Sequence, residues 1–361
     1  MHLLLVCLLS AAVLPAPGQD TAPALGWTDV RQLRVEGQGW TETAAPFDRF
    51  PARAESSVRK AVWDLSRHSA GIAVRFVTNA STIHARWTLR NERLAMPHMP
   101  ATGVSGLDLY VRLPNRWHWV ANGRPLKTEN EQALLRDWPG GEREYLLYLP
   151  LYNGVTSVEI GVPEGASLAP APIRPAGVRP IVFYGSSILQ GGCASRPGMA
   201  YPAILGRMLD WPVINLGFSG NAKSEPEIAA LLAELDPAVF VYDSLPNLSA
   251  EEARERVEPF LRSLRKARPQ TPILLVENAI YTDVQFSESR RTLIASKNQT
   301  LRQTFDKLRK EGDRLLFYID GRKLFGDDGE ATVDGTHPND IGFLRMAQAI
   351  EPALRRAVMR R

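Results

Sequence analysis

Two residues near the C-terminal end of this 361-residue chain can carry acid-base chemistry. Asp334 and His337 lie three residues apart in the run Val-Asp-Gly-Thr-His-Pro-Asn, and no other histidine follows His118. Imidazole is the side chain that exchanges a proton most readily near neutral pH, so His337 is the candidate general base of the second half. A serine that it could activate, Ser187, lies upstream in Phe-Tyr-Gly-Ser-Ser-Ile. These residue types favour nucleophilic attack by serine, with Asp334 holding the imidazole.

The second half of the chain alternates short apolar runs with helical periods, which predicts a parallel sheet with helices on both faces. In such a sheet, functional residues gather beyond the carboxyl ends of the strands. We expect strands at residues 181–184, 213–216, 239–242, 273–277 and 315–318. We expect helices at residues 201–209, 226–235, 250–267, 287–310 and 340–358.

The first half has a different sequence pattern, because its short apolar runs are separated by turns rich in Gly, Asn and Pro. Many short strands with regular turns predict an all-β sandwich or jelly roll over residues 25–163. Seven of the eight tryptophans fall in this half. Aromatic faces can bind sugars, but packing in a β-sandwich is the more common use of tryptophan. We expect strands around residues 74–76, 83–87, 107–113, 117–120, 144–149 and 155–162.

A segment dense in Pro and Gly joins the two halves. Neither helices nor central strands accept such a composition, so residues 164–180 are predicted to be a linker between a β-domain and a domain at residues 181–361.

The candidate residues converge on one edge of the predicted sheet. Ser187 follows the first strand of the second half, Gly220 follows the second strand and Asn247 follows the third, while Asp334 and His337 precede the last helix. The four sequence blocks, in chain order, are Gly-Ser-Ser, Asn-Leu-Gly-Phe-Ser-Gly-Asn, Leu-Pro-Asn and Asp-Gly-Thr-His. In this order and spacing they resemble the SGNH hydrolase superfamily, also called GDSL esterases. The resemblance implies a flavodoxin-like, three-layer α/β fold with a parallel sheet.

The resemblance also implies roles for these residues. Ser187 would be the nucleophile, His337 the base and Asp334 its partner. The oxyanion would be stabilised by the backbone N–H groups of Ser187 and Gly220 and by the side-chain amide of Asn247. The chain departs from the usual pattern, since Ser186 replaces the Asp of Gly-Asp-Ser and the third block lacks Gly-x-Asn-Asp. Neither change removes a catalytic atom.

A subgroup of this superfamily carries an N-terminal β-domain marked by Gly-x-Asp-Leu-Tyr, and residues 106–110 read Gly-Leu-Asp-Leu-Tyr. With this second match the resemblance covers nearly the whole chain after the first residues. It implies an esterase that acts on acylated, commonly acetylated, carbohydrates.

Other acids compete with Asp334 as the partner of His337. Asp243, Glu277 and Asp320 also lie near predicted strand ends, so any of them could line the site. Only Asp334 has the three-residue relation to His337 that lets both side chains leave one tight turn.

The remaining histidines of the β-half are expected to be packing or surface residues, because no spacing among them matches a metal-ligand pattern. The mechanism needs neither a metal nor a cofactor. The histidines concerned are His68, His84, His98 and His118.

Residues 1–18 have the features of a secretory signal, with an apolar run at residues 3–14 and small residues before the cleavage point. An uncleaved anchor is the alternative. After removal of Cys7 with the signal, Cys193 would stand alone, so we expect no disulfide and a packing role for this residue. We therefore expect a periplasmic or secreted protein without membrane attachment after cleavage.

The net charge of +4 is small for a chain of this length, and the Arg and Lys residues form no basic stripe. This distribution of charge argues against nucleic-acid binding.

Three hypotheses follow. The first is a serine esterase that removes short acyl groups, acetyl favoured, from a carbohydrate. The second keeps the fold and the chemistry but makes the substrate a lipid or a small ester. The third is a carbohydrate-binding protein whose hydrolase half is inactive, although every catalytic atom is present. No feature of the sequence specifies the oligomeric state.

Overall fold

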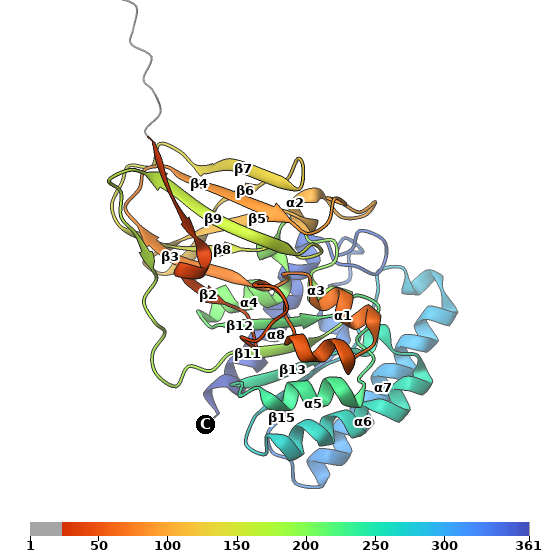
Figure 1. The fold of residues 1–361 in the computed structure, drawn as a ribbon. Helices are drawn as coiled ribbons and strands as arrows, with labels where there is room; N and C mark the ends of the chain where they lie inside the picture. Colours follow the sequence, from red (N-terminus) through yellow and green to blue (C-terminus); the bar gives the residue numbers. More distant parts are fainter. Residues whose placement is uncertain (1–23, 361) are drawn as a thin grey trace, which may run out of the picture.

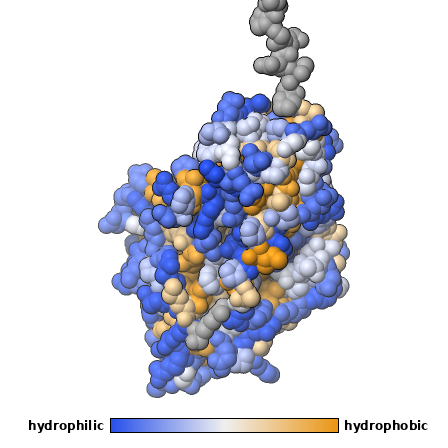
Figure 2. Space-filling model, turned by 90° about the vertical axis from the view of Figure 1, so that its left-hand side faces the viewer, coloured by the Kyte–Doolittle hydropathy of each residue, from blue (hydrophilic) through white to orange (hydrophobic). Residues whose placement is uncertain are grey.

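The computed structural model describes residues 24–360 and shows a β-rich half stacked on an α/β half (Figure 1). The predicted signal at residues 1–18 lies outside the described residues. Within residues 24–360, the helices are all too short or too polar to cross a bilayer. Polar side chains dominate the face in Figure 2, and hydrophobic side chains form small groups among them.

The N-terminal half is a sandwich of two antiparallel sheets, as predicted. One sheet has the order β1-β9-β4-β7, and the other has the order β10-β3-β8-β5-β6, with β2 paired to β3. Apolar residues from both sheets fill the space between them, with Trp87 only 1% exposed. The strands are β1 (Leu25–Asp29), β2 (Arg34–Glu36), β3 (Ala73–Thr78), β4 (Ile83–Leu89), β5 (Leu107–Leu113), β6 (Arg116–Gly123), β7 (Glu129–Leu135), β8 (Arg143–Tyr148), β9 (Val155–Pro163) and β10 (Leu168–Pro170).

The expected strands of this half are present, but the pattern missed several elements. Strand β7 contains Glu129, Asn130, Glu131 and Gln132, a polar composition that an edge strand tolerates and that periodicity does not detect. Strands β1, β2 and β10 and the short helices α1 (Lys60–Ser66) and α2 (Ala101–Val104) were also missed.

The C-terminal half contains five parallel strands in the order β12-β11-β13-β14-β15. Counted along the chain this is 2-1-3-4-5, the flavodoxin-like order, so the predicted fold class is confirmed. The strands are β11 (Ile181–Gly185), β12 (Val213–Gly217), β13 (Val239–Asp243), β14 (Ile273–Val276) and β15 (Leu316–Ile319). The helices are α3 (Ser187–Gln190), α4 (Tyr201–Leu209), α5 (Pro226–Glu234), α6 (Ala250–Ala267), α7 (Glu288–Lys310) and α8 (Asp340–Met359).

Both faces of this sheet are buried, which explains its uninterrupted apolar strands. Along β11, Ile181 and Phe183 pack with α4 and α8 in one core, while Val182 and Tyr184 pack with α5 and α6 in another. Neighbouring strand residues point to opposite faces, so each strand contributes to both cores.

Part of the N-terminal half belongs spatially to the α/β half. Figure 1 shows α1 lying against the α/β layer rather than within the β-sandwich. Val62 and Trp63 of α1 pack in the same core as α5 and α6. Within the predicted linker, β10 pairs with β3, and Arg174 forms an ion pair with Glu36 at 2.9 Å. The division of the chain at residues 164–180 stays a prediction.

Polar contacts also join the two halves. Asp108 of the Gly-x-Asp-Leu-Tyr run is fully buried and accepts hydrogen bonds from Arg196 Nη1 and from the N–H of Gly198, each at 2.8 Å. Gly106 lies where a Cβ would be 2.4 Å from the carbonyl oxygen of Thr102, so only glycine fits. The run therefore attaches β5 to the loop that follows the predicted nucleophile.

Asp243 at the end of β13 makes stability depend on pH. Its side chain is 2% exposed and accepts a 2.7 Å hydrogen bond from Tyr201 Oη. Burial raises its pKa to about 7, although the Tyr201 bond acts in the opposite direction. The unfolded chain releases this proton from the ordinary pKa of 3.8 upward, whereas the folded chain keeps it until about pH 7. The free energy of unfolding therefore falls as pH rises from 3.8 to about 7, because folding binds a proton in this range.

We expect Asp243→Asn to unfold at a higher temperature than wild type at pH 8, because the amide cannot ionise. The difference in unfolding temperature between the variant and wild type should become smaller toward pH 4, where Asp243 is largely neutral in the folded and in the unfolded chain. Thermal unfolding at pH 4, 6 and 8 measures this trend. A gap that does not change with pH would show that Asp243 does not titrate as described.

Candidate active site

The structure brings together the three residues predicted to act on an ester. Ser187 Oγ lies 2.9 Å from His337 Nε2, and His337 Nδ1 lies 2.8 Å from Asp334 Oδ2. The side chains of His337 and Asp334 are 23% and 37% exposed, while Ser187 is 7% exposed. A serine, an imidazole and a carboxylate in this order can pass a proton away from the serine hydroxyl as it attacks.

Asp334 holds the histidine through two kinds of bond. Its Oδ1 accepts hydrogen bonds from the backbone N–H of Thr336 at 3.0 Å and of His337 at 2.8 Å. Burial by itself raises the pKa of Asp334, but the hydrogen bonds from His337 and Thr336, together with the charge interaction with His337, outweigh burial and lower the pKa. The carboxylate is therefore ionised at neutral pH, as a partner of an imidazolium must be.

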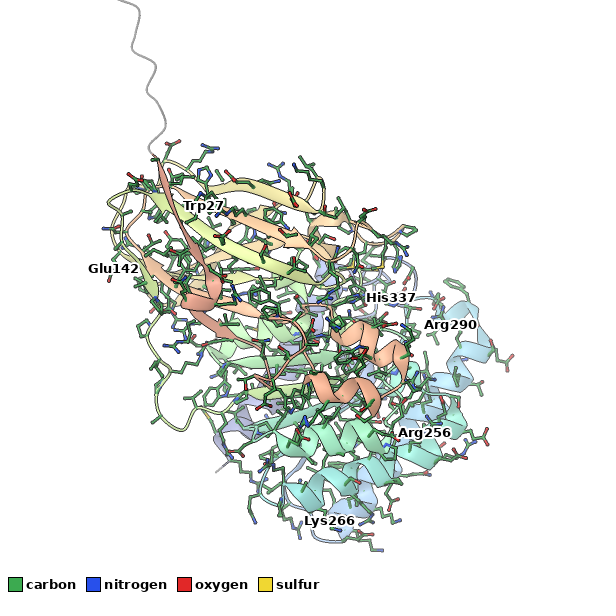
Figure 3. All side chains as sticks on the ribbon, viewed as in Figure 1. Trp27, Glu142, Arg256, Lys266, Arg290 and His337 are labelled. Carbon is green, nitrogen blue, oxygen red and sulfur yellow. The ribbon has the colours of Figure 1, made fainter. Side chains whose placement is uncertain are left out.

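Neighbouring residues hold the turn that carries this pair. Arg290 Nη2 donates to Thr336 Oγ1 at 2.5 Å, and Arg290 also pairs with Asp283. In Figure 3, His337 lies where the β-half meets the α/β half, and Arg290 lies on the same side of the molecule.

Ser187 is positioned by the sharp turn that ends β11. Ser186 caps α3 through its side chain, which accepts a hydrogen bond from Ile188 N at 3.3 Å, and Ser186 N donates to Asp243 O at 3.1 Å. Ser187 is consequently the first residue of α3, where a backbone N–H has no acceptor within the helix. A donor at this position is what the predicted oxyanion role requires.

Gly220 and Asn247 lie on loops that are joined to each other and to α3. Ala222 N donates to Asn247 Oδ1 at 3.2 Å, which orients the NH₂ group of that amide away from Ala222. Ser219 N donates to Gln190 Oε1 at 3.0 Å, so the loop before Gly220 is fixed to α3. Gly220 has φ +69° with open space where a Cβ would stand. The loop can thus turn its backbone toward an incoming group.

The competing acids have other partners. Asp243 is bonded to Tyr201, Glu277 accepts from Gly321 N at 2.8 Å, and Asp320 accepts from Arg322 N at 2.9 Å. Among the described residues, Asp334 is the one acid that bonds His337.

Sequence reasoning missed the residues that the β-half contributes. Tyr152 Oη donates to the backbone oxygen of Ser187 at 3.2 Å. His98, expected to be a packing or surface residue, is exposed, but its ring centroid lies only 5.7 Å from that of His337. No local pattern could reveal either contact, because both depend on how the two halves dock.

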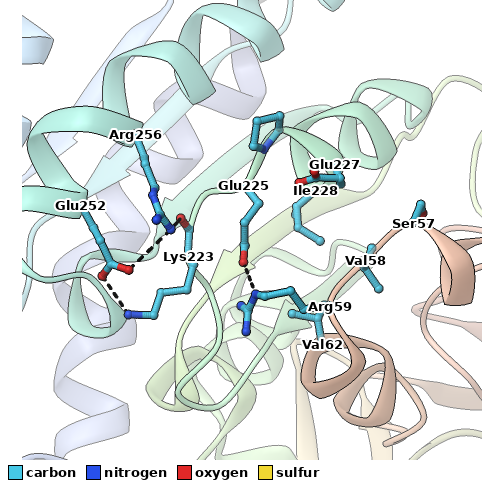
Figure 4. A pocket seen from close by; sticks show the side chains of 11 residues that line it. Ser57, Val58, Arg59, Val62, Lys223, Glu225, Glu227, Ile228, Glu252 and Arg256 are labelled. Atoms are coloured by element: carbon cyan, nitrogen blue, oxygen red, sulfur yellow. Dashed lines mark hydrogen bonds and ion pairs between the residues drawn. The ribbon is translucent and has the colours of Figure 1, made fainter.

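A cleft of about 700 Å³ lies beside the Gly220 loop, between α1 and the starts of α5 and α6 (Figure 4). Its charged side chains form ion pairs with one another, Arg59 with Glu225 at 2.5 Å and Lys223 with Glu252 at 2.8 Å. Arg59 also donates to the side chain and the backbone of Asn221, at 2.8 and 2.9 Å. The N-terminal segment therefore holds the residue next to Gly220.

Comparison with known proteins identifies the family of the chain. Residues 178–355 match the GDSL-like lipase/acylhydrolase family, and residues 25–168 match the N-terminus of SGNH hydro-type esterases. A putative GDSL-like lipase from Bacteroides ovatus ATCC 8483 is 36% identical with a TM-score of 0.88, over 93% of this chain and 98% of that one. The chain belongs to the GDSL-like lipase/acylhydrolase family. Membership makes it an esterase of the SGNH hydrolase type.

More distant structures share the fold of this esterase over nearly its full length. The salicylyl-acyltransferase SsfX3 from a tetracycline biosynthetic pathway is 18% identical with a TM-score of 0.72, over 94% of this chain and 99% of that one. A family two carbohydrate esterase from Cellvibrio japonicus is 16% identical with a TM-score of 0.61, over 93% and 99%. No curated protein matches the sequence.

We expect Asp334→Asn to lower kcat for ester hydrolysis by on the order of 10²–10⁴-fold with little change in KM, because the amide cannot stabilise an imidazolium. Steady-state kinetics on a soluble ester measures this. Asp328→Asn is the matched control, since Asp328 pairs with Arg345 at 2.6 Å in the same stretch of chain and should not affect turnover. Equal kcat for Asp334→Asn and wild type would exclude Asp334 from the reaction.

Proposed function

We propose that this esterase removes short acyl groups, acetyl foremost, from a carbohydrate by way of an acyl-enzyme. The observation that carries the proposal is the continuous path of hydrogen bonds from Ser187 through His337 to Asp334. A path of this kind serves acyl transfer, because it activates a hydroxyl nucleophile without a metal.

The reaction follows from the positions of these atoms. Ser187 Oγ attacks the ester carbonyl while His337 Nε2 takes its proton, and Asp334 stabilises the imidazolium that forms. The imidazolium then protonates the leaving sugar oxygen, which leaves an acyl group on Ser187. Water, deprotonated by His337, attacks this acyl group and releases the free acid and the serine.

The oxyanion formed in each attack needs donors that are already in place. We assign this role to the backbone N–H groups of Ser187 and Gly220 and to the amide of Asn247. The first residue of a helix offers such an N–H, and the bond from Ala222 N to Asn247 Oδ1 keeps the amide oriented. Loss of one such donor typically costs about 10²–10³ in kcat.

The surroundings of Ser187 support a small acyl group. A Cβ on Gly192 would lie 2.9 Å from Tyr152 Oη and 3.3 Å from His337 Cδ2, so this side of the nucleophile is closely packed. The carbohydrate part of the proposal is supported by the shared fold of the Cellvibrio japonicus carbohydrate esterase and by the Gly-x-Asp-Leu-Tyr β-domain.

Two alternatives keep the same fold. A lipid or small-ester esterase would use the same residues with a longer acyl chain or a different alcohol. An inactive carbohydrate-binding protein would bind a glycan without cleaving an ester.

We also propose that the protein is exported to the periplasm or the medium, because residues 1–18 have the features of a secretory signal. N-terminal sequencing of the mature protein checks this proposal.

The decisive measurement is acetate release from a panel of acetylated plant, bacterial and algal polysaccharides. We expect wild type to release acetate from at least one polymer, and Ser187→Ala to lose this activity. Ser56→Ala is the control, because Ser56 is exposed at the end of the short 3₁₀ helix Ala52–Ser56, where its hydroxyl donates to the backbone oxygen of Arg53. Turnover by Ser187→Ala at the wild-type rate would refute the proposal.

A series of soluble esters with acyl chains of increasing length separates the alternatives. We expect kcat/KM to fall as the chain grows, by about 10-fold or more for each methylene that the pocket cannot hold. A rise in kcat/KM toward long chains would favour the lipid substrate instead.

A further inference from the structure

Four side chains with metal-binding atoms meet at the catalytic histidine. One ligand atom each from His98, Cys193, Asp334 and His337 can be chosen so that all lie within 4.8 Å of one another. They come from three separate parts of the chain, namely the loop between β4 and α2, the loop after α3 and the loop before α8. We refer to these four residues as the quartet.

His98 is presented to this position by an anchored turn. Met96 and Met99 exchange two backbone hydrogen bonds, at 3.0 and 3.1 Å, and so close the turn that contains His98. Met99 is 2% exposed and packs in the core shared with α4 and α8. The imidazole of His98 is itself exposed, so a solvated ion can reach the quartet from this side.

Cys193 supplies the soft ligand of the quartet. It is a free cysteine, 4% exposed, with φ +73°. Burial and the charge of Asp334 raise the pKa of its thiol to about 12. A bound cation would stabilise the thiolate, which is the form of cysteine that coordinates metals.

The donor set selects the metal. A thiolate, two imidazoles and a carboxylate suit Zn²⁺, whereas Mg²⁺ and Ca²⁺ prefer oxygen ligands alone. The two negative ligands would balance the charge of the ion. Ligand atoms around a tetrahedral Zn²⁺ lie roughly 3.3–3.6 Å apart, so ligand atoms of the quartet that are up to 4.8 Å apart have to approach one another by about 1 Å when the ion binds.

We propose that the quartet is an inhibitory Zn²⁺ site. Binding breaks the S–H bond of Cys193, releases that proton to the solvent and forms bonds from the metal to sulfur, to one nitrogen of each imidazole and to Asp334. His337 then cannot accept the proton of Ser187, and Asp334 binds the metal instead of bonding His337 alone. Zn²⁺ thus stops the reaction reversibly. The inhibition rests on the proposed esterase function, whereas the binding does not.

Binding is tested without any activity, by titrating chelator-treated protein with Co²⁺ as a spectroscopic stand-in for Zn²⁺. We expect a thiolate-to-cobalt charge-transfer absorption that Zn²⁺ abolishes by displacement. Cys193→Ser should lose this absorption. Ser187→Ala should keep it, because the variant retains all four ligands while losing the nucleophile. Absence of the absorption in wild type and in Ser187→Ala would overturn the site.

Inhibition is tested on wild type with an acetyl ester. We expect Zn²⁺ to suppress turnover and EDTA to restore it. His98→Ala should raise the Zn²⁺ concentration for half-inhibition by more than about tenfold, since loss of even an outer-shell partner typically costs that much affinity. His118→Ala, which removes an exposed histidine of β6 outside the quartet, should keep the wild-type sensitivity.

The outcomes separate the two proposals. Equal Zn²⁺ sensitivity in wild type and His98→Ala overturns the inhibitory quartet and leaves the esterase function standing. A thiolate band without any ester hydrolysis by the metal-free protein supports the site and refutes the esterase function.

Discussion

The buried guanidinium of Arg49 ties the N-terminal half to the sheet that carries the chemistry. Arg49 is 1% exposed and donates to the backbone oxygens of His68, Leu65, Asn215 and Gly217, at 2.6 to 3.0 Å. A buried charge is tolerable only when its donors are satisfied, so these four oxygens must stay where they are. Two of them belong to β12, and the one on Gly217 ends that strand shortly before the loop of Gly220. The position of that loop therefore depends on a residue from the other half of the chain.

The same dependence recurs around the site. Asp108 of the β-half bonds the loop that follows Cys193, Tyr152 bonds the backbone of Ser187, and Arg59 bonds Asn221 beside Gly220. Preorganised donors and bases lower a barrier because they need no rearrangement during the reaction. The β-sandwich acts here as part of the scaffold that holds the catalytic loops, whatever further contact it makes with a substrate.

Sequence patterns predicted the α/β half well for a physical reason. Strands β11 to β14 are buried on both faces and each long helix has one apolar stripe, so periodicity is strong. The expected strand and helix ranges agree with the structure within about two residues. Polar β7 and the short helix α1 escaped detection, because their stability comes from contacts with distant segments rather than from a local pattern. The tryptophans of the β-half also differ in their surroundings, since Trp87 lies in the core whereas Trp119 is 43% exposed.

The predicted triad met in space because strands of a parallel sheet end at one edge, a rule that needs no side-chain coordinates. Spacing alone favoured Asp334 over Asp243, and in the structure Asp334 bonds His337 whereas Asp243 is buried against Tyr201. His98 could not be placed in this way. Its approach to His337 requires Met99 to enter the core of the other half, a contact between residues far apart in the chain.

The sequence by itself determined which atoms are available for catalysis and on which edge of the sheet they stand, because the strand ends follow from local periodicity and parallel strands end at one edge. Only the tertiary structure decided how the β-half closes on that edge. The docking of two halves depends on buried charges and shape complementarity, which no local run of residues records. The quartet around His337 is a product of that docking.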